Sequence, residues 1–256
     1  MTRKVCITGA TSGIGLATAH AFAKNGDQLL LCGRRTDRLA QIQADLEETY
    51  AVQVSTYMVD VRDLSQVEQA TTSMLAQHGS IDILVNNAGI AFSLESFETY
   101  PIADMDQMID TNVKGLLYMS RAILPSMLER NQGHIINIGS TAGMAAYGGG
   151  AVYCASKAAV KTISNGLRID TITSNIRVTT VQPGIVQTDF SRVRFHGDQE
   201  KADAVYAGIA ALQAEDIADV ILYTANQPQH VQISDVTIMA NQQATGSMIH
   251  RERTEY

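Results

Sequence analysis

A tyrosine and a lysine stand four residues apart in the segment YCASK, at Tyr153 and Lys157, just after the glycine-rich stretch AAYGGGAV. On a helix this spacing places both side chains on one face. A phenol and an ammonium group each titrate near ~10 when unperturbed, and a lysine charge held close is expected to draw the phenol pKa toward neutrality. The pair is a candidate acid/base, but taken alone the same spacing is more typical of an exposed helix turn.

A glycine-rich loop, TGATSGIG, follows the first apolar run of the chain. Its glycines leave a turn without side-chain bulk before a helix, where backbone amides and the helix dipole favour a pyrophosphate. The spacing differs from G-x-G-x-x-G but uses the same physics. The alternative is a tight strand–helix turn without a ligand. The predicted cofactor contacts in this loop are Gly9, Thr11, Ser12, Gly13, Ile14 and Gly15.

The end of the second apolar run, CGRR, bears on which dinucleotide would bind. An acidic side chain normally takes the ribose 2′-hydroxyl at this place, about 20 residues past the glycines. Here Gly33 stands there, followed by Arg34 and Arg35. Guanidinium groups bind phosphate in a bidentate fork, so the pair favours the 2′-phosphate of NADP(H). The alternative is a solvated pair at the start of a helix.

The elements that must position these residues alternate strictly along the chain. Apolar runs predict strands at 4–10, 28–34, 54–61, 81–89, 133–140, 176–184 and 235–239. Helices are predicted at 14–26, 38–50, 64–78, 105–130, 150–173 and 215–226. Strict β–α alternation with apolar strands implies a parallel sheet covered on both faces. We therefore expect an α/β fold, one doubly wound Rossmann domain over residues 1–256, with a seven-stranded parallel sheet and its ligands at the carboxyl ends of the strands.

Composition limits the classes of function. The chain has 256 residues, 45% of them hydrophobic, and a net charge of -7, which disfavours nucleic-acid binding through a basic surface. Its three cysteines form no C-x-x-C pair or metal-ligand grouping with histidine, so we expect no metal and a reducing cytoplasm. The N-terminus reaches a glycine too soon for a signal peptide, and the uncharged run 133–156 is too rich in Gly, Ser, Thr and Asn to span a membrane.

Five of these features together resemble the short-chain dehydrogenase/reductase family over essentially the whole chain. They are TGATSGIG, NNAG (86–89), Asn112, Ser140 and YCASK, in the family's order and spacing. The segments ERNQGHIINIGSTAG, VRFHGD and PQHVQISDV resemble more narrowly the NADP-dependent 3-hydroxy acid dehydrogenases, a group that includes enzymes described as serine or allo-threonine dehydrogenases. Two departures are His196, where the group often has lysine, and MANQQA near the C-terminus.

The resemblance implies four catalytic residues: Asn112, Ser140, Tyr153 and Lys157. Tyr153 would be the general acid/base, and Lys157 would favour its phenolate and bond the nicotinamide ribose. Ser140 would hold the substrate oxygen, unless it is only a hydroxyl at the start of a loop. Asn112 would hold a water that links Lys157 to solvent, unless it is a polar residue inside a helix that bonds to backbone.

The resemblance also implies further cofactor contacts. Asp60 and Val61 would meet the adenine, although Asp60 could instead cap the helix that starts near Leu64. Asn86 and Asn87 would support the sheet and the cofactor, or only form a turn. The predicted set is completed by Asn87, Ala88 and Gly89 of the NNAG segment, by Tyr153 and Lys157, and by Pro183, Gly184, Ile185 and Thr188, which resemble the loop over the nicotinamide carboxamide.

The resemblance implies hydride transfer between NADP(H) and the hydroxyl or carbonyl carbon of a small 3-hydroxy acid or β-hydroxy amino acid. Within the same fold, the alternative is a 3-oxoacyl carrier-protein reductase or a broad carbonyl reductase. The alternative that is not an enzyme is a non-catalytic NADP(H)-sensing regulator. The regulator would be expected to lack Ser140, Tyr153 or Lys157, and all three are present.

Two expectations concern larger parts of the chain. The segment 190–212 follows the sixth strand and is dense in charge, so it is expected to be a mobile lid whose Arg192, Arg194 and Lys201 are candidates to meet a substrate carboxylate. The helix segment LLYMSRAILPSML is apolar around much of its circumference, which calls for a partner surface. Members of the family that the chain resembles usually assemble through such helices. We therefore expect a homotetramer formed through residues 105–130, 150–173 and the last helix and strand.

Overall fold

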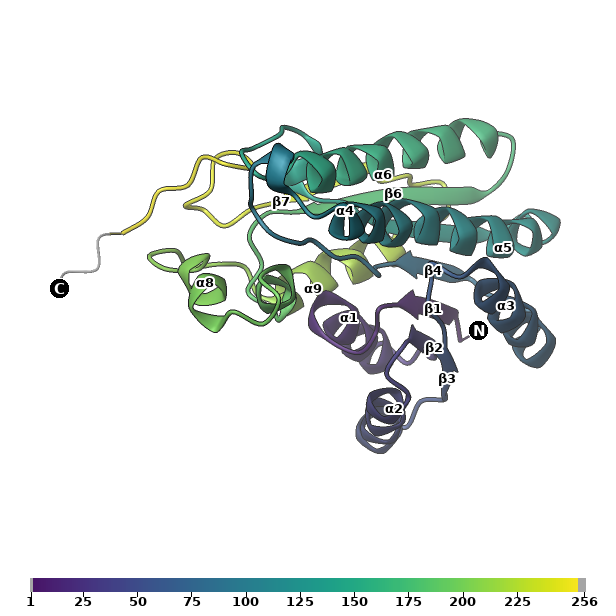
Figure 1. The fold of residues 1–256 in the computed structure, drawn as a ribbon. Coiled ribbons are helices and arrows are strands. Elements are labelled where there is room, and N and C mark those ends of the chain that lie inside the picture. The colour runs from purple at the N-terminus through teal and green to yellow at the C-terminus, as the bar shows by residue number, and fades with distance from the viewer. Residues whose placement is uncertain (1, 253–256) are drawn as a thin grey trace.

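Seven parallel strands form one sheet at the centre of the molecule (Figure 1). The computed structural model describes residues 2–252. The strands run in the order β3-β2-β1-β4-β5-β6-β7, so the chain crosses over between β3 and β4. Their bounds are β1 (Lys4–Thr8), β2 (Gln28–Gly33), β3 (Val54–Met58), β4 (Ile83–Asn86), β5 (Gly133–Ile138), β6 (Ile176–Pro183) and β7 (Asp235–Ile238). The predicted doubly wound α/β fold is confirmed.

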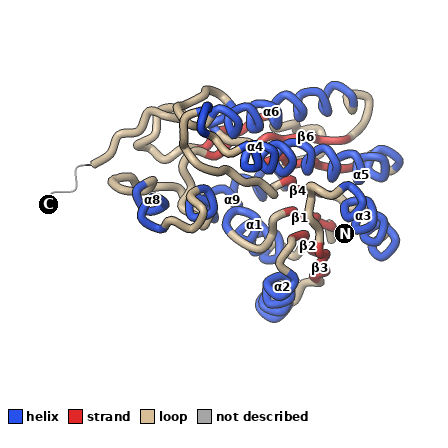
Figure 2. Tube along the Cα trace, viewed as in Figure 1, coloured by secondary structure: helices blue, strands red, loops and turns tan. Residues whose placement is uncertain are grey.

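Helices cover both faces of this sheet (Figure 2). One face packs α1 (Gly13–Lys24), α2 (Thr36–Tyr50) and α9 (Ala214–Ala225), with Phe22, Leu39 and Ile217 in its core. The other face packs α3 (Leu64–His78), α5 (Leu116–Glu129) and α6 (Ala151–Asp170), with Met74, Met119 and Val178 in its core. Every residue of β2, β4 and β5 is buried, which is why these strands read as continuous apolar runs rather than alternating ones.

The helix predicted at 105–130 is a longer and less regular element. It begins as α4 (Ile102–Ile109), passes through a wide π-helical segment η2 (Asp110–Gly115), and continues as α5. Inside the wide turn the Asn112 side chain accepts a hydrogen bond from Ile90 N and donates one to Ile90 O, both at 2.8 Å. These bonds tie the helix to the loop after β4, a long-range contact that helical periodicity could not reveal.

Several strands end earlier than predicted. β3 stops at Met58 rather than at residue 61, and β4 covers Ile83–Asn86 rather than 81–89. The residues past these ends, among them Asp60, Val61 and Gly89, turn away from the sheet and line a cavity. Val61 has the β-branched side chain of a strand residue, but it lies at the cavity wall.

The segment 190–212 contains two short helices, α7 (Phe190–Arg194) and α8 (Gln199–Ala204). It lies at the carboxyl edge of the sheet, close to the C-terminal segment in Figure 1. Backbone bonds tie it on both sides, from Ser93 N to Arg194 O at 2.8 Å and from Glu252 N to Gly208 O at 2.9 Å. Within the described residues, the helices are too short or too polar to cross a bilayer.

Candidate active site

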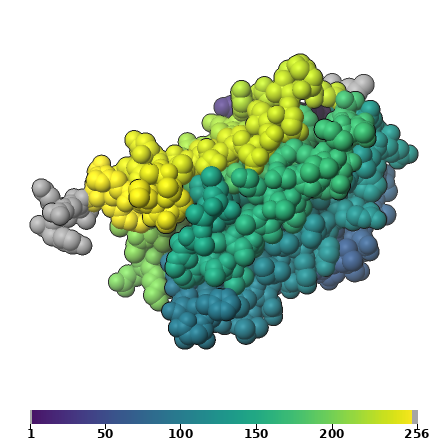
Figure 3. Space-filling model, turned by 90° about the horizontal axis from the view of Figure 1, so that it is seen from above, coloured from purple at the N-terminus to yellow at the C-terminus, as the bar shows by residue number. Residues whose placement is uncertain are grey.

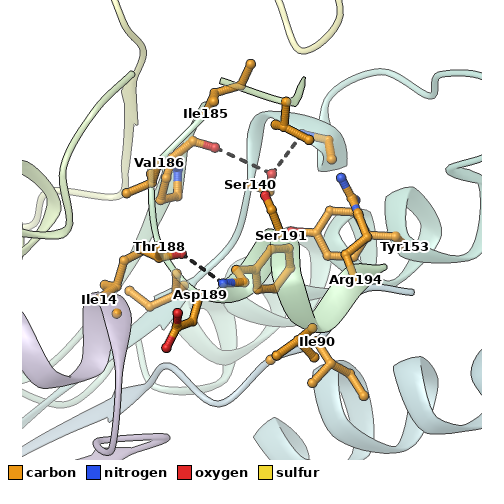
Figure 4. A pocket seen from close by; sticks show the side chains of 18 of the residues that line it. Ile14, Ile90, Ser140, Tyr153, Ile185, Val186, Thr188, Asp189, Ser191 and Arg194 are labelled. Carbon is orange, nitrogen blue, oxygen red and sulfur yellow. Dashed lines mark hydrogen bonds between the residues drawn. The ribbon is translucent and has the colours of Figure 1, made fainter. Parts of the chain in front are cut away.

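A cavity of about 910 Å³ opens at the carboxyl edge of the sheet, and Figure 4 shows part of its wall. This is the edge at which doubly wound folds bind their ligands. The structure brings together nearly all predicted site residues. Those that line the cavity are Gly9, Thr11, Ser12, Gly13, Ile14, Arg34, Arg35, Asp60, Val61, Asn87, Ala88, Gly89, Ser140, Tyr153, Lys157, Pro183, Gly184, Ile185 and Thr188. Gly15 and Asn112 are the two predicted residues that lie behind its wall.

The glycine loop has a geometry that only glycines allow. Gly9 and Gly13 have φ of 65° and 52°, in the left-handed region. Gly15 serves packing, because a Cβ there would lie 2.4 Å from both Asn87 Nδ2 and Gly9 O. The N-cap residue Ser12 makes no side-chain bond to the first turn of α1. The helix N-terminus that meets the cavity is therefore suited to an anionic group such as a pyrophosphate.

Two arginines line the far end of the cavity. Arg35 donates to Thr11 Oγ1 at 2.7 Å and to Ser12 Oγ at 3.2 Å, which orders its guanidinium over the glycine loop. The Arg34 side chain is 62% exposed and lies 4.0 Å from Asp60 Oδ2. These donors fit the extra phosphate of NADP(H), because both guanidinium groups face the cavity from the carboxyl end of β2.

Asp60 is held by a residue that the sequence did not single out. Arg62 donates to both carboxylate oxygens, at 2.6 Å in the shorter bond, and this hydrogen bonding lowers the Asp60 pKa below its usual range. Asp63, not Asp60, caps α3 by accepting from Gln66 N at 3.2 Å. The helix-cap alternative for Asp60 is therefore wrong.

The NNAG segment divides its work between the sheet and the cavity. Asn86 donates to Asn137 Oδ1 at 2.9 Å and to Ser120 Oγ at 3.0 Å, inside the core. Asn87 donates to Thr8 O at 2.9 Å, which joins the loop after β4 to the end of β1. Both asparagines thus support the sheet, and Asn87 does so at the cavity wall.

Gly89 lies between two of the proposed catalytic residues. A Cβ there would lie 3.3 Å from Asn112 Oδ1 and 3.4 Å from Lys157 Nζ. Asn112 is buried and bonds to the backbone of Ile90 and to Ser156 Oγ, as the structural alternative anticipated. It is placed beside Lys157 but does not face the cavity.

Tyr153 and Lys157 lie on one face of α6, as their spacing predicts. Lys157 is 6% exposed and donates to Ile138 O at 2.8 Å, and burial lowers its pKa to about 8. The expectation that this lysine draws the phenol pKa toward neutrality is not met, because desolvation at the cavity wall raises the pKa of Tyr153 to about 12. The buried Lys157 ammonium is hydrogen-bonded to the Ile138 carbonyl, and its Nζ lies 5.9 Å from the Tyr153 ring centroid.

Ser140 begins the short 3-10 helix η3 (Thr141–Gly143) and caps it. Its Oγ accepts from Ala142 N at 3.1 Å and donates to Pro183 O at 3.4 Å, and its bond to the Tyr153 side chain lowers the pKa of that phenol. Ser140 thus both caps the start of this loop and lies beside the Tyr153 phenol. A substrate oxygen could therefore contact the Ser140 hydroxyl and Tyr153 together.

Two parts of the wall were missed from the sequence. One is the aromatic and cationic cluster around Tyr153, formed by Tyr147, Phe190 and Arg194, of which only Arg194 had been considered. The other is the C-terminal segment, whose stretch MANQQA the sequence marks only as a departure near the substrate or interface region; here Gln243 Oε1 accepts from Ile185 N at 3.0 Å. Its wall residues, Gln243, Gly246, Ser247, Ile249 and Arg251, come from a stretch without periodicity or a recognisable motif.

The family profile of the short chain dehydrogenases matches residues 3–199. The chain belongs to this family, and with it to the oxidoreductases that act on hydroxyl and carbonyl groups. It is 46% identical over 249 residues, 96% of this chain and 99% of the relative, to the NADP-dependent 3-hydroxy acid dehydrogenase YdfG of Salmonella typhi.

Two further similarities bear on the site. The sulfoacetaldehyde reductase 2 of Chromohalobacter salexigens is 42% identical over 241 residues, which cover 94% of this chain and 95% of the relative. A solved structure described as the closed form of serine dehydrogenase complexed with NADP+ superposes with a TM-score of 0.90 at 41% identity, covering 97% of this chain and 100% of that one.

Proposed function

We propose that this protein is an NADP-dependent dehydrogenase that oxidises the hydroxyl group of a small 3-hydroxy acid or β-hydroxy amino acid, and reduces the corresponding carbonyl in reverse. The observation that carries this proposal is the placement of Tyr153, Ser140 and Arg194 together on one cavity wall. An acid/base, a hydroxyl that can hold oxygen and a cation that can hold an acid group thus face the same space.

The chain's residues divide the work of the reaction. The bound nicotinamide accepts or supplies the hydride, which is the cofactor's own chemistry. Tyr153 Oη takes the proton from the substrate hydroxyl during oxidation and returns it during reduction. Ser140 Oγ holds the same substrate oxygen, and Lys157 Nζ, buried behind the ring, would hold the nicotinamide ribose. Asn112 positions Lys157 through the loop at Gly89.

NADP is the preferred cofactor in this proposal because the adenosine end of the cavity is cationic. The glycine loop and the N-terminus of α1 would hold the pyrophosphate. Arg34 and Arg35 would hold the 2′-phosphate, while Arg62 keeps the Asp60 carboxylate occupied. The names of the relatives, an NADP-dependent dehydrogenase and an NADP+ complex, support the same choice.

Arg194 is the best placed of the three cations proposed to meet the acid group. Arg192 lies 3.9 Å from Asp189, and Lys201 lies 3.1 Å from Asp198, so both have an acidic partner. Arg194 has none among the residues that the structure describes; it donates to Tyr147 Oη at 2.8 Å. The names of two relatives, a hydroxy acid dehydrogenase and a sulfoacetaldehyde reductase, each imply an anionic substrate.

Initial rates with NADP⁺ test the proposal against a panel of 3-hydroxy acids, β-hydroxy amino acids and their methyl esters. We expect the acids to have a far higher kcat/KM than the esters. The Arg194→Ala change should raise KM for the acid far more than for the ester, whereas Arg192→Ala should raise both little. Equal use of acids and esters by the unmodified enzyme would instead describe a broad carbonyl reductase, and no turnover with any of them would favour a cofactor-sensing regulator.

The assembly and location of the protein are also proposals. Exposed apolar side chains on α5 and α6 and between α6 and β6, such as Leu117, Leu128, Ile169 and Ile172, support a homotetramer. Figure 3 shows the face on which α6 and the C-terminal segment run side by side. A monomer at micromolar concentration in light scattering would contradict the tetramer. Three buried free thiols, Cys6, Cys32 and Cys154, are compatible with a reducing cytoplasm.

We further propose that residues 1–256 act as one domain in which residues 190–212 form a mobile lid. One sheet carries all seven strands within the described residues, which supports a single domain. The lid would exclude water and position the substrate over Tyr153. Hydrogen exchange in this segment should slow when cofactor and product are bound together, and unchanged exchange would contradict the lid.

A further inference from the structure

Arg194 lies against the proposed acid/base rather than only near the substrate space. Its Cζ atom is 5.1 Å from the centroid of the Tyr153 ring and 5.8 Å from that of Phe190 (Figure 4 shows Arg194 beside Tyr153). A guanidinium within about 6 Å of an aromatic face is attracted to the ring electrons. The nearest lysine charge, on Lys157, is 5.9 Å from the same centroid and donates to a backbone carbonyl.

The position of this guanidinium is fixed from several sides. Its Nη2 donates to Tyr147 Oη at 2.8 Å, and the Arg194 carbonyl accepts from Ser93 N at 2.8 Å. Its Nε is buried and finds no hydrogen-bond partner among the described residues. The charge is therefore held over the ring without a carboxylate that would neutralise it.

We propose that Arg194 is a positioning residue for the proton transfer, and that its charge stabilises the phenolate form of Tyr153. The inference rests on the proposed function, in which the phenolate takes the proton of the substrate hydroxyl. A cation beside a phenol favours the ionised oxygen, and the effect is strongest where water is excluded. The charge that activates the acid/base thus comes from α7, on the substrate side.

The other groups that face the phenol make this contribution necessary. They are Tyr147 from the loop before α6, and Cys154 and Lys157 from α6 itself. Desolvation raises the pKa of Tyr153, Arg194 exerts the largest opposing effect, and Tyr147 and Cys154 add to the rise. The hydrogen bond from Ser140 also lowers this pKa. Without Arg194, the phenol would face mainly groups that disfavour its ionised form.

The test is the pH dependence of oxidation for Arg194→Met, which removes the charge and keeps an apolar side chain over the ring. The substrate is the methyl ester of a 3-hydroxy acid, so that loss of carboxylate binding has no effect. We expect the acidic limb of the kcat profile to move up by about one pH unit. Arg194→Lys should restore most of the unmodified pH profile. Arg192→Met removes a charge from the same helix and should leave the pH of the acidic limb unchanged.

A second readout does not depend on turnover. In protein labelled with ¹³C at tyrosine Cζ, the Tyr153 resonance is assigned by its loss in Tyr153→Phe, and its titration with NADP⁺ bound is followed by NMR. Arg194→Met should shift the titration upward by the same amount. If Arg194→Met proves unstable, Arg194→Gln, which removes the charge but keeps an amide that can donate to Tyr147 Oη, should shift the titration in the same direction.

The outcomes separate this inference from the proposed function. If Tyr153→Phe stays active, the proposed function fails. If Tyr153→Phe is inactive while both profiles of Arg194→Met match the unmodified enzyme, only the inference is overturned, and Arg194 serves substrate binding alone.

Discussion

The two edges of the sheet differ in the surroundings of their buried and half-buried cations. At the amino edge, Arg3 forms two bonds to Asp27, at 2.8 and 2.7 Å, and Arg130 lies 2.9 Å from Asp82. At the carboxyl edge, Lys157 and Arg194 have no acidic partner among residues 2–252. The paired charges at the amino edge join the ends of neighbouring segments, whereas Lys157 and Arg194 lie beside the proposed acid/base. The contrast predicts that changes at one edge alter the rate and changes at the other alter the free energy of unfolding.

The largest effect is expected at the carboxyl edge. Tyr153→Phe removes the proton carrier and should lower kcat by at least about 10³-fold, because general acid–base assistance is typically worth 10²–10⁴. NADPH binding, followed by the fluorescence of the nicotinamide, should change less than threefold or so. The unfolding midpoint should stay within about 1 °C. A variant that keeps most of its kcat would remove Tyr153 from the mechanism.

The second effect belongs to the amino edge. Asp27 is 3% exposed, so Asp27→Ala leaves the Arg3 guanidinium without its carboxylate and should lower the free energy of unfolding by about 2–3 kcal/mol in urea. Asp45→Ala is the matched control, because Asp45 is 62% exposed and its partner His20 is 3.9 Å away. Both variants should keep KM and kcat at 25 °C, and a selective fall in kcat for Asp27→Ala would break the division between the edges.

Next comes the cofactor end of the carboxyl edge. Changing both Arg34 and Arg35 to alanine should raise KM for NADP⁺ about ten- to hundredfold, since each charged hydrogen bond is worth about 1.5–3 kcal/mol. KM for NAD⁺ should change far less. Arg38→Ala is the control, because Arg38 lies in the first turn of α2, close to both arginines in the chain, and does not line the cavity. Equal losses with both cofactors would assign the arginines to structure.

The smallest effect concerns His134, a buried histidine at the amino edge. Thr179 Oγ1 donates to Ile233 O at 2.7 Å, so it must accept from His134 Nε2, 2.8 Å away, and Nδ1 is the unprotonated nitrogen. Burial, with the charges of Arg177 and Arg3, lowers the His134 pKa well below its usual range. Below about pH 6.5 the unfolded chain binds a proton that the native state does not, so stability is lost as pH falls.

The His134→Gln change measures how much the titration of His134 contributes to the pH dependence of the free energy of unfolding. The free energy of unfolding of the unmodified protein should fall by about 1 kcal/mol more than that of the variant between pH 7.5 and 5.5. Above pH 7.5 the difference between the two proteins should be constant. Parallel curves over the whole range would show that His134 titrates normally.

The fold could be predicted from the sequence because its rules are local and repetitive. Apolar runs of strand length between helical periods specify a parallel sheet, and the glycine loop marks the first crossover. Strand ends were less predictable: Val59 and Val61 continue the apolar run on either side of Asp60, yet all three residues line the cavity. A strand ends where the neighbouring strand no longer offers hydrogen-bond partners. Which residues have such partners depends on the assembled sheet and not on the local sequence.

The site was predictable where a motif carries it and unpredictable where packing does. The Tyr153–Lys157 spacing gave the correct helix face, but the pKa of Tyr153 is raised by desolvation and opposed by Arg194, which is 41 positions away (194 − 153 = 41). Likewise, nothing in the sequence around Gln243 indicates its bond to Ile185. Such contacts join segments that approach one another only in the folded chain.

The π-helical segment between α4 and α5 has a consequence for the allowed length of the chain. It contacts both ends of the cavity, since Asn112 holds Ile90 while Gly115 leaves room for Val61, whose side chain would lie 2.6 Å from a Cβ at that position. Each residue turns an α-helix by about 100°. Deleting one residue between 110 and 115 would let the helix close regularly, but it would rotate Met108 of α4 out of the core or Met119 of α5 away from the sheet. Substitutions in this segment can be absorbed one side chain at a time, whereas a change of length cannot, so its residue count is more strictly constrained than its composition.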